Sequence, residues 1–443
     1  MLTQINLGGG WDKWKLIKKK INPWSVYPGA FIGWMVDGFD LSMMFLLIPI
    51  LAPQFFPKSS AIAIIGVWSI YTITLVCRPL GGILFGILGD KIGRRKAIFA
   101  AVAGLGISVF LTGFLPNYHS IGVWAPISLT FLRVLTGIFA GGEYSNSAVI
   151  IVESAEKNKR GRWGGAIQAG YAVGFLLAAV LFLFLHYAIP KESFANYGWR
   201  WMFWSSIVLT VIALLVVKYR MIESAKWEKA KEEGRTKKMP LTEILKNGET
   251  LKEVLTGILF MVGMSWIYGL TLGFFPTVLA LGKQFVFPQT LYVVIIALTA
   301  AVIGYLSSGF VSDFIGRRRT VITFSLIAII VSLFATQIIS KTNDFTYCAI
   351  FASILGFFSA GLYGVTPTYL SERFSTHIRS TAVGISFNFG FIFGNWGTAI
   401  LLVFTKISSS NFPNMWSAFI IFGEALVMLS ALLSKETKDV ELR

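Results

Sequence analysis

Charged side chains are scarce in this sequence. Asp, Glu, Lys and Arg make up 14% of its 443 residues, whereas a soluble domain carries about 25%. Hydrophobic residues account for 55%, and the mean hydropathy is +0.68. So few charges cannot cover the surface of a soluble protein of this size. The composition therefore predicts a chain whose solvent is the lipid bilayer.

Cysteine and catalytic motifs are scarce as well. Cys77 and Cys348 both lie in apolar runs, where we interpret them as packing residues and not as a disulfide framework. The sequence contains no metal-ligand constellation, no nucleotide-binding loop and no nucleophile-base motif. We therefore expect neither an enzyme nor a bound metal or organic cofactor.

Long apolar runs, in contrast, recur along the whole chain. A helix needs about 20 apolar residues to cross a bilayer core of about 30 Å. By this measure the sequence predicts an all-α integral membrane protein with twelve transmembrane helices and both termini on one side. The spans are expected near 25–52, 61–89, 97–115, 124–151, 163–188, 200–219, 254–281, 290–312, 320–340, 345–370, 380–405 and 413–434.

The basic residues are distributed unevenly between the two sides of these spans. Of 39 Lys and Arg residues, 31 lie on the side of the termini and six on the opposite side. Because cytoplasmic loops carry the excess of Lys and Arg, we expect both termini in the cytoplasm and the protein in the cell membrane. The net charge of +17 then reflects topology and attraction to anionic lipid, and not nucleic-acid binding. Residues 1–20 are polar and basic, so no cleavable signal is expected.

A hydrophilic loop divides the chain nearly in half. It is rich in Lys and Glu, and we interpret it as a tether with amphipathic helices on the membrane surface. The expected organisation is a cytoplasmic segment, a six-helix bundle, the central loop, a second six-helix bundle and a cytoplasmic tail, at 1–24, 25–219, 220–253, 254–434 and 435–443.

The two halves repeat one another in sequence, which indicates a parallel duplication. One motif follows the second span and, 223 residues later, the eighth: Gly86, Asp90, Gly93, Arg94 and Arg95 match Gly309, Asp313, Gly316, Arg317 and Arg318. Another follows the fourth span and, 219 residues later, the tenth: Glu153, Arg160 and Gly165 match Glu372, Arg379 and Gly384. Two pseudo-symmetric bundles are the simplest explanation.

The first motif resembles the signature loop of the major facilitator superfamily, and the twelve spans with a central loop match that superfamily over the whole chain. The resemblance implies that these loops latch the cytoplasmic ends of the bundles together in the outward-open state. The glycines allow a tight turn, and the aspartates lie at helix ends where an arginine or a helix N-terminus can pair with them.

Within the superfamily, three motifs resemble the proton-coupled metabolite and organic-acid symporters, including their sialate-type relatives. These motifs are Asp37-Gly-Phe-Asp40, Arg78-Pro-Leu-Gly-Gly82 and Gly141-Gly-Glu143-Tyr144. Sugar porters share the loops after the sixth and twelfth spans, but their usual proline is replaced here by Ile222 and Lys435.

Charged residues inside the spans are the candidates for chemistry, because a charge at mid-bilayer costs about 2.5–3.5 kcal/mol on insertion scales. Asp37 and Asp40 share one helix face, and Arg133 lies at a comparable depth. We expect an ionised aspartate to hold Arg133, and its protonation to release the arginine for an anionic substrate. A static buried ion pair is the alternative.

Other buried polar residues have less definite roles. Arg78 is a second candidate for carboxylate recognition or a structural partner of Asp37. Glu143 is either a proton exit or a packing partner, and Glu424 is interpreted as structural. Tyr268, Asn388 and Asn395 are expected to line the substrate cavity in the second bundle.

The sequence thus predicts a proton-coupled symporter for a small organic anion, working by alternating access, with protons as the coupling ion and a monomer as the functional unit. A proton-coupled sugar or polyol symporter is the nearest alternative. A drug-proton antiporter and a transporter-like nutrient sensor follow; the antiporter's usual Gly-Pro motif is missing because residues 165–185 contain no proline.

Overall fold

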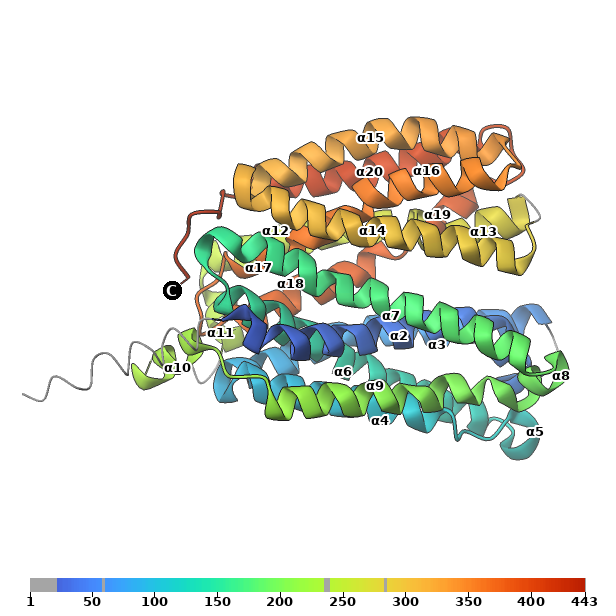
Figure 1. Ribbon diagram of the computed structural model, residues 1–443, viewed down its shortest axis with the longest axis horizontal. Coiled ribbons are helices and arrows are strands. Elements are labelled where there is room, and N and C mark those ends of the chain that lie inside the picture. The colour runs from blue at the N-terminus through green and yellow to red at the C-terminus, as the bar shows by residue number, and fades with distance from the viewer. Residues whose placement is uncertain (1–21, 58–59, 235–239, 283–284, 443) are drawn as a thin grey trace, which may run out of the picture.

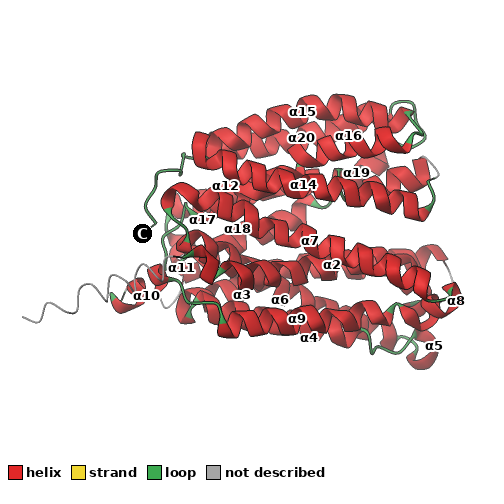
Figure 2. Cartoon of the chain, viewed as in Figure 1, coloured by secondary structure: helices red, strands yellow, loops and turns green. Residues whose placement is uncertain are grey.

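The structure is a computed structural model that describes residues 22–57, 60–234, 240–282 and 285–442. Most of the predicted N-terminal segment 1–24 therefore lies outside the described residues. Within the described part, twelve helical segments are long and apolar enough to span a membrane, which confirms the predicted number. Helices are the only regular secondary structure there (Figure 2).

The first half of the chain forms six long helices. They are α2 (Tyr27–Phe55), α3 (Ser60–Ile92), α4 (Arg94–Thr112), α6 (Trp124–Ser154), α7 (Arg160–Ala188) and α9 (Arg200–Tyr219). Short helices join them: η1 (Pro23–Ser25), α5 (Tyr118–Ile121), η2 (Lys157–Lys159), α8 (Lys191–Ser193) and η3 (Phe194–Gly198). The central loop contains α10 (Ala225–Glu232) and α11 (Pro240–Lys246).

The second half repeats this pattern with more interruptions. Its long helices are α12 (Gly248–Leu270), α14 (Phe287–Ile315), α15 (Arg317–Lys341), α16 (Phe345–Phe358), α18 (Arg379–Gly394) and α20 (Phe412–Leu433). Shorter pieces continue three of them: α13 (Phe275–Thr277), η4 (Val278–Gly282), η5 (Ala360–Val365), α17 (Thr366–Ser371) and α19 (Gly397–Phe404). Pro276 and Pro367 each lie in the first turn after a break, where a missing N–H costs least.

The two bundles lie side by side with their helices roughly parallel (Figure 1). They meet where α3 packs against α18 and α7 packs against α14. Glycine permits this close approach: a Cβ atom at Gly384 would lie 2.4 Å from the carbonyl oxygen of Gly82. Any side chain at this contact would push the bundles apart.

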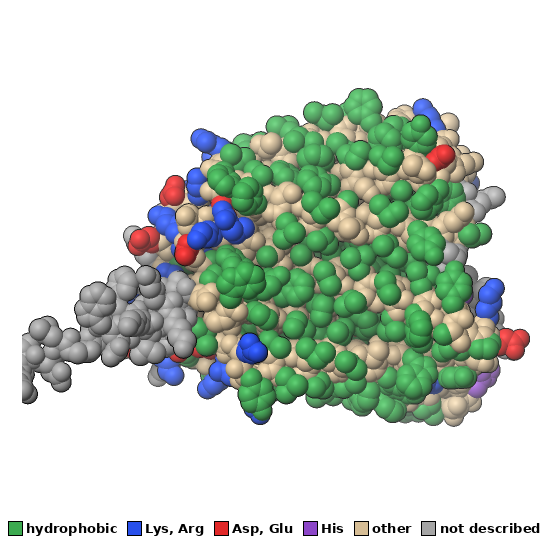
Figure 3. Space-filling model, viewed as in Figure 1, with side chains coloured by type: hydrophobic (Ala, Val, Ile, Leu, Met, Phe, Trp, Pro, Cys, Tyr) green, Lys and Arg blue, Asp and Glu red, His purple; other side chains and the backbone are tan. Residues whose placement is uncertain are grey.

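The surface has a hydrophobic belt and one basic end. Hydrophobic side chains cover the middle of the molecule, and Lys and Arg side chains gather near the C-terminus (Figure 3). We call this the basic end; it contains the turns at Gly93 and Gly316, between α3 and α4 and between α14 and α15. The belt is the surface that a membrane protein presents to lipid.

Candidate transport site

Asp37 and Arg78 form a buried ion pair within the first bundle. The guanidinium binds the carboxylate through two hydrogen bonds, Nη2 to Oδ2 at 2.5 Å and Nη1 to Oδ1 at 3.1 Å. Both side chains are fully buried. At 1.5 Å per helical residue, Asp37 lies about 15 Å from the start of α2, so the pair is near mid-membrane. This bidentate geometry is the strong form of an arginine–carboxylate ion pair.

Asp40 and Arg133 form a second pair, one helical turn further along α2. Nη1 of Arg133 donates to Oδ1 and Oδ2 of Asp40 at 2.8 and 3.2 Å, and Nη2 donates to the hydroxyl of Thr112 at 3.0 Å. Arg133 also lies 5.9 Å from the ring centroid of Phe203. Thr112 belongs to α4 and Phe203 to α9, so this pair faces the interior of the first bundle.

Each aspartate thus has its own arginine. The sequence left open which aspartate holds Arg133, and whether Arg78 binds substrate or pairs with Asp37; in this conformation Arg133 contacts Asp40 and Arg78 contacts Asp37. The two like charges on α2 are therefore each compensated.

Asn388 connects the Asp37–Arg78 pair to the second bundle. Its carbonyl oxygen accepts from Nε of Arg78 at 3.5 Å, and its amide donates to the carbonyl oxygens of Gly141 at 3.1 Å and Gly384 at 2.8 Å. One side chain of α18 thereby touches both α3 and α6. A change in the Asp37–Arg78 pair would therefore alter a hydrogen bond at the contact between the bundles.

A cavity of about 490 Å³ lies between the bundles, beside this pair. Tyr268 and Asn395 line it, whereas Asn388 is not among its lining residues. Arg78 approaches the cavity through Phe391, whose ring centroid lies 5.5 Å from the guanidinium carbon. The remaining wall is largely aromatic and apolar, and includes Phe45, Trp68, Tyr71, Tyr171, Phe175, Phe274 and Trp396.

The cavity is displaced toward the end opposite the basic end. It is lined by residues 41–45 in the second half of α2 and by residues 68–76 in the first half of α3. Because α2 starts and α3 finishes at the basic end, both segments lie away from it (Figure 1). This cavity therefore lies on the side of the charge pairs that faces away from the basic end.

An aromatic layer lies on the other side of the charge pairs. Tyr144 of α6 stacks on Phe387 of α18, with ring centroids 3.5 Å apart, and Trp34 packs against both rings at 4.6 and 5.9 Å. All three side chains are buried. The layer therefore joins the two bundles between the cavity and the basic end.

Two buried glutamates stand apart from the ion pairs. Glu143 accepts a hydrogen bond from the hydroxyl of Ser147 at 2.5 Å and packs against Gly33 of α2. Glu424 of α20 is fully buried and faces the hydroxyls of Ser325 and Ser359. Neither forms an ion pair with another described residue; the salt bridges of the described residues are elsewhere in the molecule. The sequence showed both charges but could not show this isolation.

The signature loop of the first half binds the second bundle. Asp90 accepts hydrogen bonds from the backbone N–H groups of Ser380 and Thr381 at 3.1 and 2.9 Å, at the start of α18. Arg94 donates to the carbonyl oxygen of Thr376 at 2.5 Å. Glu153 pairs with Arg379 at 2.5 Å. A carboxylate at a helix N-terminus is favoured by both the free N–H groups and the helix dipole.

The signature loop of the second half makes matching contacts with the first bundle. Asp313 accepts from the N–H groups of Gly161 and Arg162 at 2.7 and 3.0 Å, at the start of α7. Glu372 pairs with Arg317 at 2.9 Å and approaches Arg160 at 3.5 Å. The sequence repeat is thus a structural two-fold repeat at the basic end.

The remaining motif residues shape these turns. Gly93 and Gly316 adopt φ values of 110° and 98°, a region that a side chain disfavours. Glu223 accepts from the N–H groups of Arg94 and Arg95, and Glu436 accepts from those of Arg317 and Arg318. Gly86 and Gly309 have no room for a Cβ, because it would lie 2.7 Å from Thr381 and 2.5 Å from Gly161.

Comparison with known proteins now adds an independent line of evidence. The family model of the Major Facilitator Superfamily matches residues 30–308, and that of "Sugar (and other) transporter" matches residues 287–437. The chain is similar to the shikimate transporter of Escherichia coli (strain K12), with 29% identity over 93% of each chain. It is also similar to the proline/betaine transporter of the same organism, with 26% identity over 94% of this chain and 84% of that protein.

A solved structure shares the fold. The proton:xylose symporter XylE, from Escherichia coli, superposes with a TM-score of 0.78 at 19% identity, over 95% of this chain and 97% of that chain. The fold and superfamily predicted from the signature loops are therefore confirmed; the sialate-type branch stays a prediction. This chain belongs to the Major Facilitator Superfamily, a family of membrane transporters and not of enzymes.

Proposed function

We propose that this protein is a proton-coupled symporter for a small organic anion with a carboxylate group. The observation that carries the proposal is the pair of buried aspartate–arginine contacts on α2, one of which adjoins the cavity. Buried charges inside a membrane are costly and mark ion or substrate pathways. Protons are the only coupling ion that the proposal needs.

The two aspartate–arginine pairs are assigned different roles. Arg78 lies next to Phe391 of the cavity wall and carries a guanidinium fork, so it is the candidate for binding the substrate carboxylate. Arg133 faces α4 and α9 inside the bundle, so Asp40 and Arg133 are the candidate proton switch. This refines the expectation that Arg133 binds the substrate.

The proposed cycle begins in the conformation seen here, which is closed at the basic end. A proton that enters through the cavity neutralises Asp40 or Asp37 and frees an arginine from its carboxylate. A substrate anion bound at Arg78 then balances the positive charge of the freed arginine. Once the proton and the anion are both bound, the two bundles rock against each other. The contacts of Asp90 and Asp313 then break, and the proton and the anion leave together. Glu143 directly precedes Tyr144 of the aromatic layer and packs against Gly33, so it is a candidate exit group for the proton.

The relatives support an anionic or zwitterionic cargo. Shikimate carries a carboxylate, as do proline and betaine, and all three are named as substrates of similar proteins. A neutral sugar is the second candidate, favoured by the match of residues 287–437 to the sugar transporter model and by the fold of the xylose symporter. The aromatic wall of the cavity suits either cargo, but only an anion uses the charge of Arg78.

The decisive experiment is uptake into proteoliposomes driven by a pH gradient, with shikimate, succinate, lactate, benzoate, proline, glycine betaine, xylose and glucose as cargoes. We expect accumulation of at least one carboxylate, collapse of that accumulation by a protonophore, and no accumulation of the sugars. Uptake of sugars alone would overturn the anion assignment, and accumulation that survives the protonophore would overturn proton coupling.

We further propose that the protein functions as a monomer in the cell membrane, with the basic end in the cytoplasm. The excess of Lys and Arg at that end supports the orientation. Thiol-reactive reagents of low membrane permeability test it: a cysteine at Glu156, in the basic end, should react only after the membrane is opened, and one at Asn117 should react in intact cells. Cross-linking in native membranes checks the monomer.

A further inference from the structure

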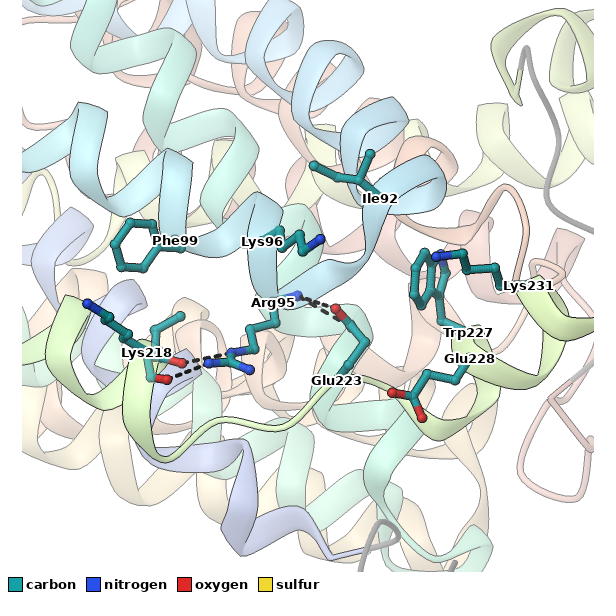
Figure 4. Close-up of a pocket in the computed structure, with 10 residues that line it drawn as sticks. Ile92, Arg95, Lys96, Phe99, Lys218, Glu223, Trp227, Glu228 and Lys231 are labelled. Carbon is teal, nitrogen blue, oxygen red and sulfur yellow. Dashed lines mark hydrogen bonds between the residues drawn. The ribbon is translucent and has the colours of Figure 1, made fainter.

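A second cavity lies at the basic end, outside the transport site. It has a volume of about 530 Å³ and is formed by the start of α4, the end of α9 and helix α10 (Figure 4). Its lining contains four basic side chains, two acidic side chains and four apolar ones: Arg95, Lys96, Lys218 and Lys231; Glu223 and Glu228; Ile92, Phe99, Val217 and Trp227.

The lining of this cavity carries more positive than negative charge. Lys96, Lys218 and Lys231 are exposed, and none of them forms an ion pair with another described residue. Lys218 and Lys231 instead lie 5.2 Å from the ring centroids of Tyr219 and Trp227. Three ammonium groups with free donors therefore surround the opening, and each can turn toward an anion.

Glu223 does not neutralise them, because its carboxylate is used elsewhere. It accepts hydrogen bonds from the N–H groups of Arg94 at 3.0 Å, Arg95 at 3.2 Å and Ser224 at 2.9 Å. Burial raises the pKa of Glu223, and the backbone N–H groups and Arg94 oppose that rise. Figure 4 shows the carboxylate directed at the backbone of Arg95.

Arg95 is held in place as part of the wall. Its Nε donates to the carbonyl oxygen of Val217 at 3.0 Å, and its Nη2 donates to that of Lys218. The guanidinium therefore joins α4 to the end of α9 and contributes a fixed positive charge. Fixed and mobile cations together make a site for a phosphate group.

The apolar part of the lining distinguishes a lipid from a free phosphate ion. Ile92 and Phe99 remain 41% and 38% exposed, so the cavity offers apolar surface beside its lysines. A phosphate ion gains nothing from this surface, whereas a phospholipid covers it with its acyl chains while its headgroup meets the lysines. Basic pockets at this depth between transmembrane helices suit anionic headgroups.

We propose that this cavity binds an anionic phospholipid, with the headgroup phosphate held by Lys96, Lys218 and Lys231 and an acyl chain along Ile92 and Phe99. The site touches the latch between the bundles: Nε1 of Trp227 donates to the carbonyl oxygen of Asp90 at 2.9 Å, and Asp90 binds the start of α18. A bound lipid therefore fixes α10 against the signature loop and stabilises the closed basic end.

The test uses the purified full-length chain and native mass spectrometry, with phosphatidylglycerol as the probe. We expect one tightly bound phosphatidylglycerol per chain, and a loss of affinity of about tenfold or more in the triple variant Lys96→Gln, Lys218→Gln, Lys231→Gln. A matched variant, Arg319→Gln, Lys435→Gln, Lys438→Gln, removes the same charge from the corresponding end of the second bundle and should bind as the wild type does.

Two further arms identify the source of the phosphate. Phosphatidylcholine and inorganic phosphate, each added to the wild type, should raise the Tm by less than half of the shift seen with phosphatidylglycerol. Equal stabilisation by inorganic phosphate would overturn the lipid assignment, and equal binding by the triple and matched variants would overturn the site. If the triple variant does not fold, Lys218→Gln alone must still weaken binding by at least about twofold.

Discussion

The two halves of this transporter are nearly identical at the basic end and very different inside the membrane. At the basic end, Asp90 binds the start of α18 and Asp313 binds the start of α7, with matching glycines, arginines and glutamates around them. Inside, the first bundle holds two aspartate–arginine pairs. The second bundle holds the isolated Glu424 and contributes aromatic and amide side chains to the cavity.

This contrast teaches which part of a duplicated transporter is free to change. Both halves must close the same end of the molecule, so both keep the capping aspartate and the glycines without room for a Cβ. Under the proposed mechanism, one set of switchable charges is enough inside the membrane, and each additional charge costs free energy. The second bundle is therefore free to supply surface for substrate instead of ion chemistry.

The strongest test of this comparison is to remove the carboxylates on α2. Asp40→Asn should abolish accumulation driven by a pH gradient, so that internal substrate rises only to the external concentration, because an amide cannot exchange a proton. Counterflow exchange should remain. Asp37→Asn should impair both processes, because it also releases Arg78.

Breaking a buried pair costs about 3–5 kcal/mol of stability, so both variants need a folding check by size-exclusion chromatography and Tm. Full gradient-driven accumulation in both well-folded variants would discard the proton mechanism.

The next largest effect separates the two arginines. Arg78→Lys keeps the charge but loses the two-pronged contact, so we expect KM for the anion to rise by about tenfold while the coupling to protons persists. Arg133→Lys is the matched control, and it should change the pH dependence of uptake more than KM. The opposite pattern would exchange the roles assigned to the two pairs.

The contacts of Asp90 and Asp313 at the basic end provide a test in which both halves should respond alike. Asp90→Asn and Asp313→Asn each remove a capping carboxylate and should favour opening of the basic end. In a chain with Cys77→Ala, Cys348→Ala and Thr368→Cys, alkylation of the buried cysteine between α17 and α7 should accelerate several-fold in both variants. A response to one aspartate only would mean that the repeat is not symmetric in function.

The smallest effect is expected in the second bundle. Among the described residues, Glu424 has hydroxyls but no cation beside it. Glu424→Gln replaces its carboxyl group by an isosteric amide, so it should change gradient-driven accumulation by less than about twofold. The Asp40→Asn variant measured in parallel shows the size of a true coupling defect. A loss as large as that one would place a proton site in the second bundle and end the contrast between the halves.

Much of the architecture could be predicted because bilayer solvation imposes it. Twelve apolar runs and a repeated motif indicate the helices and the duplication without any tertiary information. Helix boundaries were less accurate: α12 starts at Gly248, six residues before the expected 254, and α2 continues to Phe55. The ends of these helices lie at the membrane–water interface and are polar, so a hydropathy window does not include them.

The site was only partly predictable. The sequence identified Asp37, Asp40, Arg78 and Arg133 because a charge within an apolar run is visible by itself. It did not identify which aspartate meets which arginine, because a helical turn of 5.4 Å and a flexible guanidinium leave both pairings within reach. It also placed Asn388 in the cavity, whereas that side chain bridges Arg78 to α6.

By itself, then, the sequence determined the solvent, the number of spans, the duplication and the set of buried charges, since each of these depends on residue type and local spacing. Only the tertiary structure decided the pairing of those charges, the side of the pairs on which the cavity lies, and the assembly of three distant lysines into one pocket. These features depend on how the helices rotate and pack against one another, and local sequence patterns do not specify that packing.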